Sequence, residues 1–399
     1  MNRNSLKNIK TLEYESLGNV LLTGFTGFLG AHILDSFLKK EKGTIYCLIR
    51  EKENVPALQR LKNTLNFYFE DKYDKYIGNR IKLVNGDISY ENLGLSLDEY
   101  TKLGKNISTV IHSAALVKHY GTYEEFEKIN IIGTKNVVKL SIDFNLKMMH
   151  ISTISISGNV LAEQANIKNN FTEDKYYNET NFYIEQNIEN LYVNSKFKGE
   201  DIVLEAISKG LKAYIFRMGN LTSRFSEGKF QQNHFENAFV NRFKSILQIG
   251  FAPDYLLDGY VEFTPIDYCA DAIIDLASHY NNEYSVFHLL NDNHVQMKRL
   301  CKELETIGIP IKIVSSKKFK EIINNLLQDD ETKDYLQGII NDFDENQKLV
   351  YESDVKIESE FTKKILENIG FNWPYIDTNY LKNYFKYLAQ IGYFNINIK

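Results

Sequence analysis

A glycine-rich turn between a short apolar run and a helical pattern constrains the fold of this chain more than any other feature. Gly24, Gly27 and Gly30 follow the apolar residues 20–22 at intervals of three. Glycine at position 24 permits a tight strand-to-helix turn. A missing side chain at position 27 lets a pyrophosphate approach the backbone, and Gly30 lets the helix pack closely on the strand. The helix then directs its free N–H groups and the positive end of its dipole at phosphates, so the turn predicts a dinucleotide site.

The residues on either side make this prediction more specific than three glycines alone, which any tight turn can carry. The apolar run reads as a buried strand, and residues 28–38 place apolar side chains at helical spacing. The residues expected to contact the cofactor in this turn are Gly24, Thr26, Gly27, Phe28, Leu29 and Gly30.

Strand patterns alternate with helical patterns along the first 220 residues. After the strand at 20–22, further strands are expected at 44–49, 80–84, 109–112, 148–152 and 212–216. Alternation of this kind predicts a parallel sheet with helices on both faces and right-handed crossovers. The expected fold class is therefore α/β, a Rossmann-type doubly wound parallel sheet.

The alternation breaks down beyond about residue 220, where a smaller, mostly helical C-terminal lobe is expected to bind the substrate. Residues 224–260 are polar and aromatic without a clean period, and the pattern from residue 298 onward is helical with charged faces. The predicted parts are a lead-in at 1–18, a nucleotide-binding Rossmann domain at 19–220 plus 265–290, and the C-terminal lobe at 221–264 plus 291–399.

The composition argues against several classes of function. The 399 residues carry a formal net charge of −5, which gives no general affinity for nucleic acid. No apolar run is long enough to span a membrane, and no N-terminal segment resembles a signal peptide. Cys47, Cys269 and Cys301 have no paired spacing, which suits a reducing cytoplasm and predicts no metal site. We expect a cytoplasmic protein that is monomeric as a domain and has no nucleic-acid or membrane partner.

Arg50 ends the second strand, where an NAD site usually has an acidic residue for the ribose 2′-hydroxyl. An arginine instead suits a 2′-phosphate, which its planar fork can bind bidentately. Arg60 in the following helix could add a second contact, although both could also be solvated surface residues. We therefore expect NADPH rather than NADH.

Two further segments are expected to line the cofactor because they follow neighbouring strands at the same edge of the sheet. Asp87 with Ile88 ends the third strand, where the carboxylate could meet an adenine amino group. Ser113, Ala114 and Ala115 end the fourth strand, and their small side chains leave room for the cofactor. Either segment alone could be a plain loop.

Tyr192 and Lys196 lie four residues apart in a helical pattern, which puts both side chains on one face of the helix. A phenol titrates at about pH 10, and a nearby ammonium favours the phenolate and lowers this pKa. The lysine can also bind the nicotinamide ribose. Tyr68 and Lys72 have the same spacing, in a charged helix that we expect to be exposed. Tyr192 is preferred because its helix follows the fifth strand of the sheet.

Thr153 is expected to complete the catalytic group, because it directly follows the fifth strand at the carboxyl edge where open sheets bind ligands. Its hydroxyl could hydrogen-bond a substrate carbonyl oxygen. Ser152 and Ser155 are competing candidates. Asn130, in the helix below the lysine, could hold a water or fix the local backbone near the cofactor, and a purely structural role is an alternative.

Together these motifs resemble the extended short-chain dehydrogenase/reductases, which share the wide glycine spacing. They are more similar still to the thioester reductase domains that end nonribosomal peptide synthetases and occur in carboxylic acid reductases. The resemblance covers about 18–290, and its segments are Val110–Val117, Tyr123–Asn130, Gly133–Thr134, Ile151–Thr153, Tyr192–Lys196 and Phe216–Leu221. It implies that Gly219 and Asn220 lie in a loop near the nicotinamide.

The resemblance also implies a reaction. A carrier protein would deliver an acyl or peptidyl thioester on a phosphopantetheine arm, and NADPH would give hydride to its carbonyl. Tyr192 and Thr153 would hydrogen-bond the developing oxyanion, Tyr192 would donate the proton, and Lys196 would lower the pKa of Tyr192 and hold the ribose. The hemithioacetal would release a thiol and an aldehyde, and a second round could give an alcohol.

A carrier protein usually presents an acidic surface, so a basic cluster in the C-terminal lobe is a candidate docking site. The alternative is a solvated helix face. The cluster consists of Lys312, Lys317, Lys318 and Lys320.

Other functions stay open on the residues alone. A fatty acyl-CoA reductase shares the chemistry and differs in its thiol carrier. A sugar-nucleotide epimerase or dehydratase would keep NAD bound and would suit an acid at position 50, so Arg50 argues against it. A non-catalytic module that senses NADPH would not need Thr153, Tyr192 and Lys196 together.

Overall fold

The computed structural model describes residues 13–51, 55–117, 121–158, 175–279, 284–328, 333–340, 343 and 355–393. The chain divides into two compact units. Unit 1 comprises residues 1–219, 266–289 and 355–372, and unit 2 comprises residues 220–265, 290–354 and 373–399. Most of the expected lead-in lies outside the described residues.

Residues 355–372 lie in unit 1, not in the C-terminal lobe to which the sequence assigns them. The reason is a long-range strand pairing, in which β15 (Val355–Ile357) runs parallel to β6 (Lys175–Tyr177). In the helix that follows, α12 (Glu360–Asn368), the Thr362 hydroxyl donates to Glu179 Oε1 at 2.7 Å. Local periodicity carries no information about a partner so distant in the sequence.

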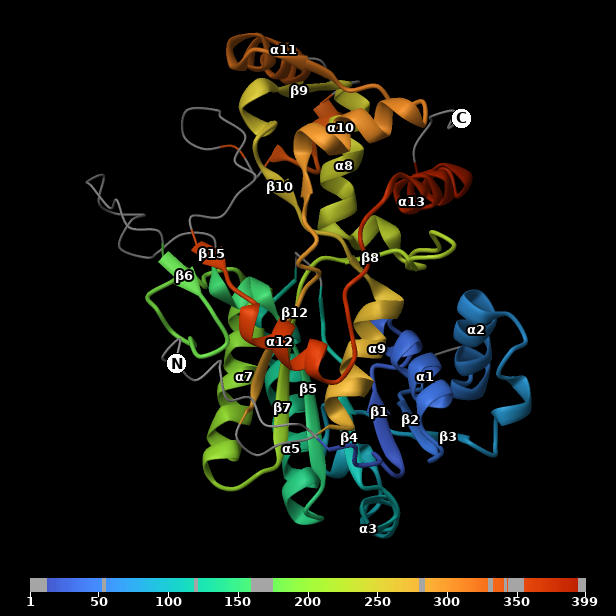
Figure 1. Cartoon of the computed structure of the whole chain (residues 1–399). Helices are drawn as coiled ribbons and strands as arrows, with labels where there is room; N and C mark the ends of the chain where they lie inside the picture. Colours follow the sequence, from blue (N-terminus) through green and yellow to red (C-terminus); the bar gives the residue numbers. More distant parts are fainter. Residues whose placement is uncertain are drawn as a thin grey trace. The chain divides into compact units, whose positions relative to one another are not determined.

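A seven-stranded sheet forms the centre of unit 1, with strand order β12-β7-β5-β4-β1-β2-β3 (Figure 1). Every neighbouring pair in it is parallel. The strands are β1 (Val20–Thr23), β2 (Ile45–Ile49), β3 (Ile81–Asn85), β4 (Thr109–His112), β5 (Lys147–Thr153), β7 (Ala213–Met218) and β12 (Val286–Leu289). This confirms the predicted Rossmann-type α/β fold.

Helices cover both faces of the sheet because the direction of the crossovers reverses between β1 and β4. The crossovers through α1 and α2 run toward β3, whereas those through α5 and α7 run toward β12, and right-handed crossovers place the two sets on opposite faces. Helix α1 packs against α9, and α5 packs against α3 and α7. The helices are α1 (Phe28–Lys40), α2 (Ala57–Phe69), α3 (Leu97–Asn106), α4 (Tyr123–Phe126), α5 (Gly133–Asp143), α7 (Leu191–Ser208) and α9 (Ile266–Ala277). Open sheets bind ligands at such a reversal, outside the carboxyl ends of the strands.

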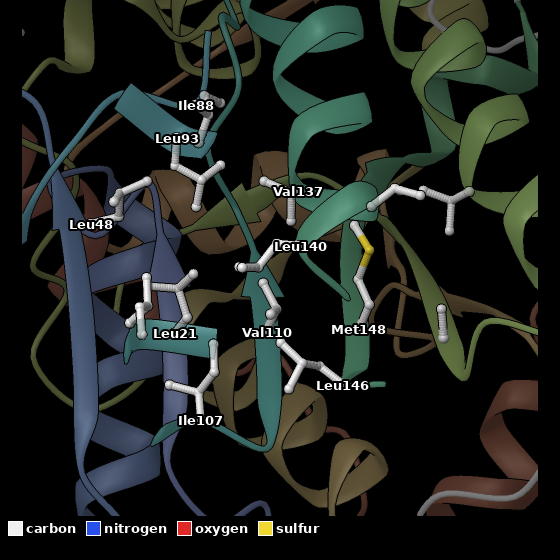
Figure 2. Packing of buried hydrophobic residues seen from close by; sticks show 14 of the residues in the cluster. Leu21, Leu48, Ile88, Leu93, Ile107, Val110, Val137, Leu140, Leu146 and Met148 are labelled. Carbon is white, nitrogen blue, oxygen red and sulfur yellow. The ribbon is translucent and has the colours of Figure 1, made fainter. Parts of the chain in front are cut away.

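Buried aliphatic side chains hold one helical layer against the sheet (Figure 2). Leu21, Val110 and Met148 come from β1, β4 and β5, and Val137 and Leu140 come from α5; none of the five is exposed to solvent. Full burial of a side chain of this kind contributes about 1.5–3 kcal/mol. The packing fixes α5 and the turn before it, which carries Asn130.

Unit 2 is mostly helical and agrees with the smaller lobe that the sequence predicts. Its described helices are α8 (Ala238–Ile249), α10 (Met297–Thr306), α11 (Ser316–Gln328) and α13 (Thr378–Gln390). Short strands pair as β8 (Leu221–Thr222) with β11 (Thr264–Pro265), β9 (Phe251–Pro253) with β14 (Lys312–Val314), and β10 (Tyr260–Val261) with β13 (Val295–Gln296). Aromatic rings fill its interior, where Phe243 packs against Phe263 and Phe385.

None of the helices in the described residues is both long and apolar enough to cross a membrane. The part of the chain that the structure describes also has no group of three or more His, Cys, Asp or Glu residues arranged to hold a metal ion. Cys47, Cys269 and Cys301 are buried.

Candidate active site

The glycine turn joins β1 to α1 at the point where the crossovers reverse. Gly24 has a φ of +73°, and a Cβ there would lie 2.5 Å from the backbone nitrogen of Ala114. A Cβ at Gly30 would lie 2.2 Å from the Gly24 carbonyl oxygen. A side chain at either position would therefore clash with the protein's own backbone.

Gly27 differs, because the protein leaves space beside it. A Cβ there would meet only the Gly24 carbonyl oxygen within 4 Å, at 3.2 Å. Gly27 is also the N-cap of α1, whose first turn has no side-chain cap and no acidic residue. Space and uncapped N–H groups are what a pyrophosphate requires, so the turn fits a dinucleotide cofactor.

Arg50 and Arg60 bring two positive charges to the carboxyl end of β2. Arg60 donates through Nη1 to the Arg50 carbonyl oxygen at 2.5 Å and through Nη2 to Oγ1 of Thr26, in the glycine turn, at 3.3 Å. Burial and the charge of Arg50 lower the pKa of Arg60. No carboxylate within the described residues pairs with either guanidinium. The arrangement fits an anion beside the glycine turn.

The other residues expected to line the cofactor follow β3 and β4. Asp87 is half-buried, and Ile88 packs into the core of unit 1. Ser113, Ala114 and Ala115 are half-buried, and the first two lie against the glycine turn. All five residues therefore lie at the carboxyl edge of the sheet, where the glycine turn also lies.

Asn130 lies in a π-helical turn, Glu127–Ile132, and its buried side chain bonds to the backbone. Its Oδ1 accepts from the Leu116 N–H at 2.7 Å, and its Nδ2 donates to the Leu116 carbonyl at 3.0 Å and to Ser195 Oγ at 2.8 Å. These bonds tie the segment after β4 to α7, next to Lys196. They favour the role of fixing the local backbone.

Tyr192 and Thr153 lie beside each other at the carboxyl end of β5. Helix α7 is capped by Asn190, whose side chain accepts from the Val193 N–H at 3.1 Å, so Tyr192 falls in its first turn. Burial raises the pKa of Tyr192 to about 12, and the neighbouring Thr153 side chain lowers it by a smaller amount. The phenol is therefore protonated at neutral pH and can donate a proton.

Lys196 lies one turn further along α7, and its buried Nζ donates to the Ile151 carbonyl oxygen at 2.6 Å. Burial lowers the pKa of Lys196 to about 8, and the charge of Glu200 opposes this change. The net change in the pKa of Tyr192 is a rise, whose largest cause is the loss of water around the phenol. The spacing of Tyr192 and Lys196 along the helix does not show this loss of water, and the lowering of the Tyr192 pKa by Lys196 stays a prediction.

The hydroxyls near the end of β5 have different partners. Ser152 Oγ donates to Glu200 Oε2 at 2.7 Å. Thr153 Oγ1 donates to Ser155 Oγ at 3.1 Å and accepts from the Ser155 N–H at 3.2 Å. Of these hydroxyls, that of Thr153 is the one that acts on Tyr192, and Thr153 is itself held by Ser155.

The other Tyr-x-x-x-Lys pair differs from the expectation. Tyr68 is buried rather than exposed, and its ring packs against Phe28 and His32. Lys72 lies beyond the end of α2 and pairs with Asp35 at 2.9 Å. The two residues therefore do not share a helix face, and the apolar side of α2 takes Tyr68 into the core.

Glu200 and Arg217 form a buried ion pair beside Lys196 that the sequence did not reveal. The available signal was a charge within an apolar pattern, since Arg217 interrupts the buried strand β7 and Glu200 lies four residues after Lys196. Lys, Glu, Arg and Asp are almost never fully buried unless they are paired.

Gly219 and Asn220 follow β7. The Gly219 N–H donates to the Leu289 carbonyl at 2.9 Å. Asn220 is the first residue of unit 2, where its N–H donates to a Glu262 carboxylate oxygen at 2.6 Å. Burial raises the pKa of Glu262 to about 7. The contact of this loop with a nicotinamide stays a prediction.

Comparison with known proteins identifies a family whose sequence model matches this chain. Residues 22–273 match the model of an NAD-binding family described as Male sterility protein. A solved thiolation-reductase di-domain from an archaeal non-ribosomal peptide synthetase has 37% sequence identity and a TM-score of 0.83. That match covers 97% of this chain and 78% of the di-domain chain.

Two curated relatives are much longer than this chain. One component of the linear gramicidin synthase from Brevibacillus parabrevis is 29% identical over 77% of this chain and 6% of its own length. Carboxylic acid reductase from Segniliparus rugosus is 28% identical over 74% of this chain and 26% of its own length. The chain thus spans about a quarter or less of these relatives.

Proposed function

The chain belongs to the NAD-binding family described as Male sterility protein and, within it, to the reductase domains of nonribosomal peptide synthetases, and from this premise we propose that it reduces a carrier-bound acyl or peptidyl thioester to an aldehyde with NADPH. The observation that carries the proposal is the placement of Tyr192 beside Thr153 at the carboxyl edge of the sheet, where the glycine turn also lies, with Lys196 one helical turn away on α7. Two hydroxyls at one point can stabilise negative charge on a carbonyl oxygen.

The cofactor is a nicotinamide dinucleotide, as the family and the shape of the glycine turn both indicate. The residues that would hold it are those of the turn and of the carboxyl ends of β2, β3 and β4. When bound, it supplies a hydride to the thioester carbonyl carbon.

NADPH is the form of the cofactor that we propose. Arg50 and Arg60 follow the second strand where an NAD site usually presents a carboxylate. A 2′-phosphate there would receive charge-assisted hydrogen bonds from two guanidinium groups. Arg60 is already oriented by its bonds to Thr26 and to the Arg50 carbonyl.

Tyr192 and Thr153 would both hydrogen-bond the substrate oxygen as it gains negative charge. Because burial keeps the phenol protonated, Tyr192 can transfer its proton to that oxygen. Lys196, whose pKa is about 8, is mostly protonated near neutral pH and would stabilise the phenolate that remains. Hydride on carbon and a proton on oxygen give a hemithioacetal, which breaks its C–S bond to release a thiol and an aldehyde.

A carrier protein with a phosphopantetheine arm is the partner that we propose. Lys312 of β14 and Lys317, Lys318 and Lys320 of α11 are exposed, and they are the basic residues of unit 2 that we propose as its docking surface. An acidic carrier surface would complement it. Lys318 also lies 3.4 Å from Glu321, so a solvated helix face is the alternative that mutation must separate from docking.

Incubation of the chain with NADPH and an acyl-phosphopantetheine thioester tests the reaction. We expect loss of reduced-nicotinamide absorbance, a free thiol, and an aldehyde identified by mass spectrometry, with an alcohol if a second reduction follows. Faster turnover of acyl-CoA than of a carrier-bound acyl group would instead indicate a fatty acyl-CoA reductase. Cofactor binding without turnover of any thioester would refute the reductase and indicate a sensing module.

A further inference from the structure

Glu200 lies one helical turn beyond Lys196 on α7 and forms a buried ion pair with Arg217 of β7. Its Oε1 accepts from Arg217 Nε at 3.0 Å and also from Nη2, while its Oε2 accepts from Ser152 Oγ at 2.7 Å. The side chains of Glu200 and Arg217 are 0% and 1% exposed. Both carboxylate oxygens thus have fixed partners inside the core.

Arg217 is held on its other side as well. Its Nη1 lies 3.1 Å from His288 Nε2, and His288 Nδ1 lies 2.7 Å from the Glu358 carbonyl oxygen. A carbonyl can only accept, so Nδ1 carries the proton and Nε2 accepts from Arg217. The guanidinium also lies 4.9 Å from the centre of the Tyr177 ring. The orientation of Arg217 is therefore fixed independently of Glu200.

Glu200 is the carboxylate whose charge acts on Lys196 within the described part of the chain. The other titratable groups that interact with Lys196 are His112 of β4 and His150 of β5, and burial and the charge of Lys196 lower the pKa of both. Both are therefore neutral at physiological pH and supply no countercharge. Nζ of Lys196 itself donates to the uncharged Ile151 carbonyl.

A buried ion pair is poorly explained by stability alone, because the desolvation of two charges can exceed their attraction and apolar residues often replace such a pair without loss. This pair joins three elements of the candidate active site. Glu200 comes from the helix of Tyr192 and Lys196, Arg217 from β7, and Ser152 from the strand end that carries Thr153.

We propose that Glu200 and Arg217 are positioning residues, in which the Glu200 carboxylate, one helical turn from Lys196, supplies the countercharge for the Lys196 ammonium and Arg217 fixes that carboxylate within the core. The inference rests on the proposed function, in which Lys196 binds the cofactor ribose and stabilises the Tyr192 phenolate. Neither residue of the pair needs to touch substrate or cofactor.

The test compares the wild-type chain with the double variant Glu200→Gln/Arg217→Met, which removes both charges and nearly keeps the volume. Two properties are measured against pH: kcat/KM for an acyl-phosphopantetheine thioester, and NADPH affinity by fluorescence titration. Loss of the lysine proton should limit both on the alkaline side. Loss of Glu200 disfavours that proton, and loss of the Arg217 charge partly offsets the change. Because Glu200 is the charge that acts on Lys196, we expect the alkaline limb of both profiles to move to lower pH, by up to about one unit, in the double variant.

Two controls separate positioning from a structural role. Arg217→Lys keeps the charge of the partner and should leave the alkaline limb close to its wild-type position. Asp35→Asn removes another buried carboxylate of unit 1, one bound by Lys39, Lys72 and Tyr73. It should lower the melting temperature without moving the limb.

A folded double variant with wild-type alkaline limbs in both profiles would overturn the inference and would show that the pair has a purely structural role. If the double variant does not fold, Glu200→Asp retains the charge but shortens the side chain, and a smaller downward shift is expected; an unchanged limb would again overturn the inference. A wild-type chain that binds NADPH but reduces no thioester would refute the proposed function, while the NADPH titration would still decide on the pair.

Discussion

The Lys196 ammonium on α7 donates to the Ile151 carbonyl oxygen of β5 at 2.6 Å, and this bond holds the helix of Tyr192 against the strand that ends at Thr153. The Tyr192 hydroxyl, a proton donor, and the Thr153 hydroxyl therefore lie near each other at the carboxyl edge of the sheet. A substrate oxygen at that point would receive both hydrogen bonds, and their strength would increase as the oxygen gains charge.

Replacement of Tyr192 by Phe should remove the proton donor and leave the cofactor site intact. We expect kcat to fall by roughly 10²–10⁴-fold, the usual contribution of general acid catalysis, with NADPH affinity nearly unchanged. Steady-state kinetics and fluorescence titration measure the two effects. The matched control is Tyr68→Phe, since Tyr68 heads the other Tyr-x-x-x-Lys pair but packs against α1. A loss of less than tenfold for Tyr192→Phe would rule out its role as the acid.

Thr153→Val keeps the shape of the side chain and removes its hydroxyl. One oxyanion hydrogen bond would be lost, and kcat should fall by about 10²-fold with little change in melting temperature. Ser155→Ala removes only the group behind Thr153 and should have a smaller effect. If Ser155→Ala proves the more damaging of the two, the oxyanion donor has been assigned to the wrong hydroxyl.

Arg50→Asp should change the cofactor preference, because a carboxylate repels a 2′-phosphate and accepts from a ribose 2′-hydroxyl. The KM for NADPH should rise by about tenfold or more, and the KM for NADH should rise much less or fall. Initial rates with each cofactor at a fixed thioester concentration provide the comparison. Equal changes for the two cofactors would contradict the assignment of NADPH.

Two glycine substitutions in the same turn should have different effects, one on the stability of unit 1 and the other on the affinity for NADPH. Gly24→Ala forces a side chain into a left-handed backbone position against Ala114, so we expect it to destabilise unit 1 by more than about 1 kcal/mol. Gly27→Ala meets only one atom, at 3.2 Å, so the fold should be kept while NADPH affinity falls at least about tenfold. Thermal melts and NADPH titrations measure the two effects. Unchanged NADPH binding by Gly27→Ala would place the pyrophosphate elsewhere.

Charge reversal at Lys317 and Lys318 tests the basic surface of α11. If a carrier docks there, turnover of carrier-bound thioester should fall several-fold, while turnover of the free acyl-phosphopantetheine should not change. Lys102→Glu/Lys105→Glu alters two exposed lysines of α3 in unit 1 and is the matched control. An equal loss on free and carrier-bound substrates would argue against docking on α11.

The central sheet and the glycine turn could be predicted because local patterns determine them. Buried parallel strands are short apolar runs, and the glycines at 24 and 30 meet steric requirements that the chain itself imposes. The structure also distinguishes the glycines. A side chain at Gly24 or Gly30 would clash with the protein's own backbone, whereas Gly27 has space beside it. The position of Tyr192 and Thr153 at one sheet edge followed from strand order in the same way.

Features that depend on distant partners could not be predicted. The Glu200–Arg217 pair joins a helix to a strand, and nothing in either segment alone shows that the two charges meet. The high pKa of Tyr192 depends on how much water surrounds the phenol, which the spacing to Lys196 does not reveal. Tyr68 was expected at the surface because its helix is charged, but the helix has an apolar face that packs on α1.

The pairing of β15 with β6 has a practical consequence, because unit 1 includes a strand that follows most of unit 2 in the sequence. A chain shortened before residue 355 would expose one edge of β6 and leave Glu179 without Thr362. Exposed edges of this kind recruit other molecules and promote aggregation. A shortened version of this chain that is meant to keep unit 1 should therefore extend through α12, since residues 1–289 alone would lack part of that unit.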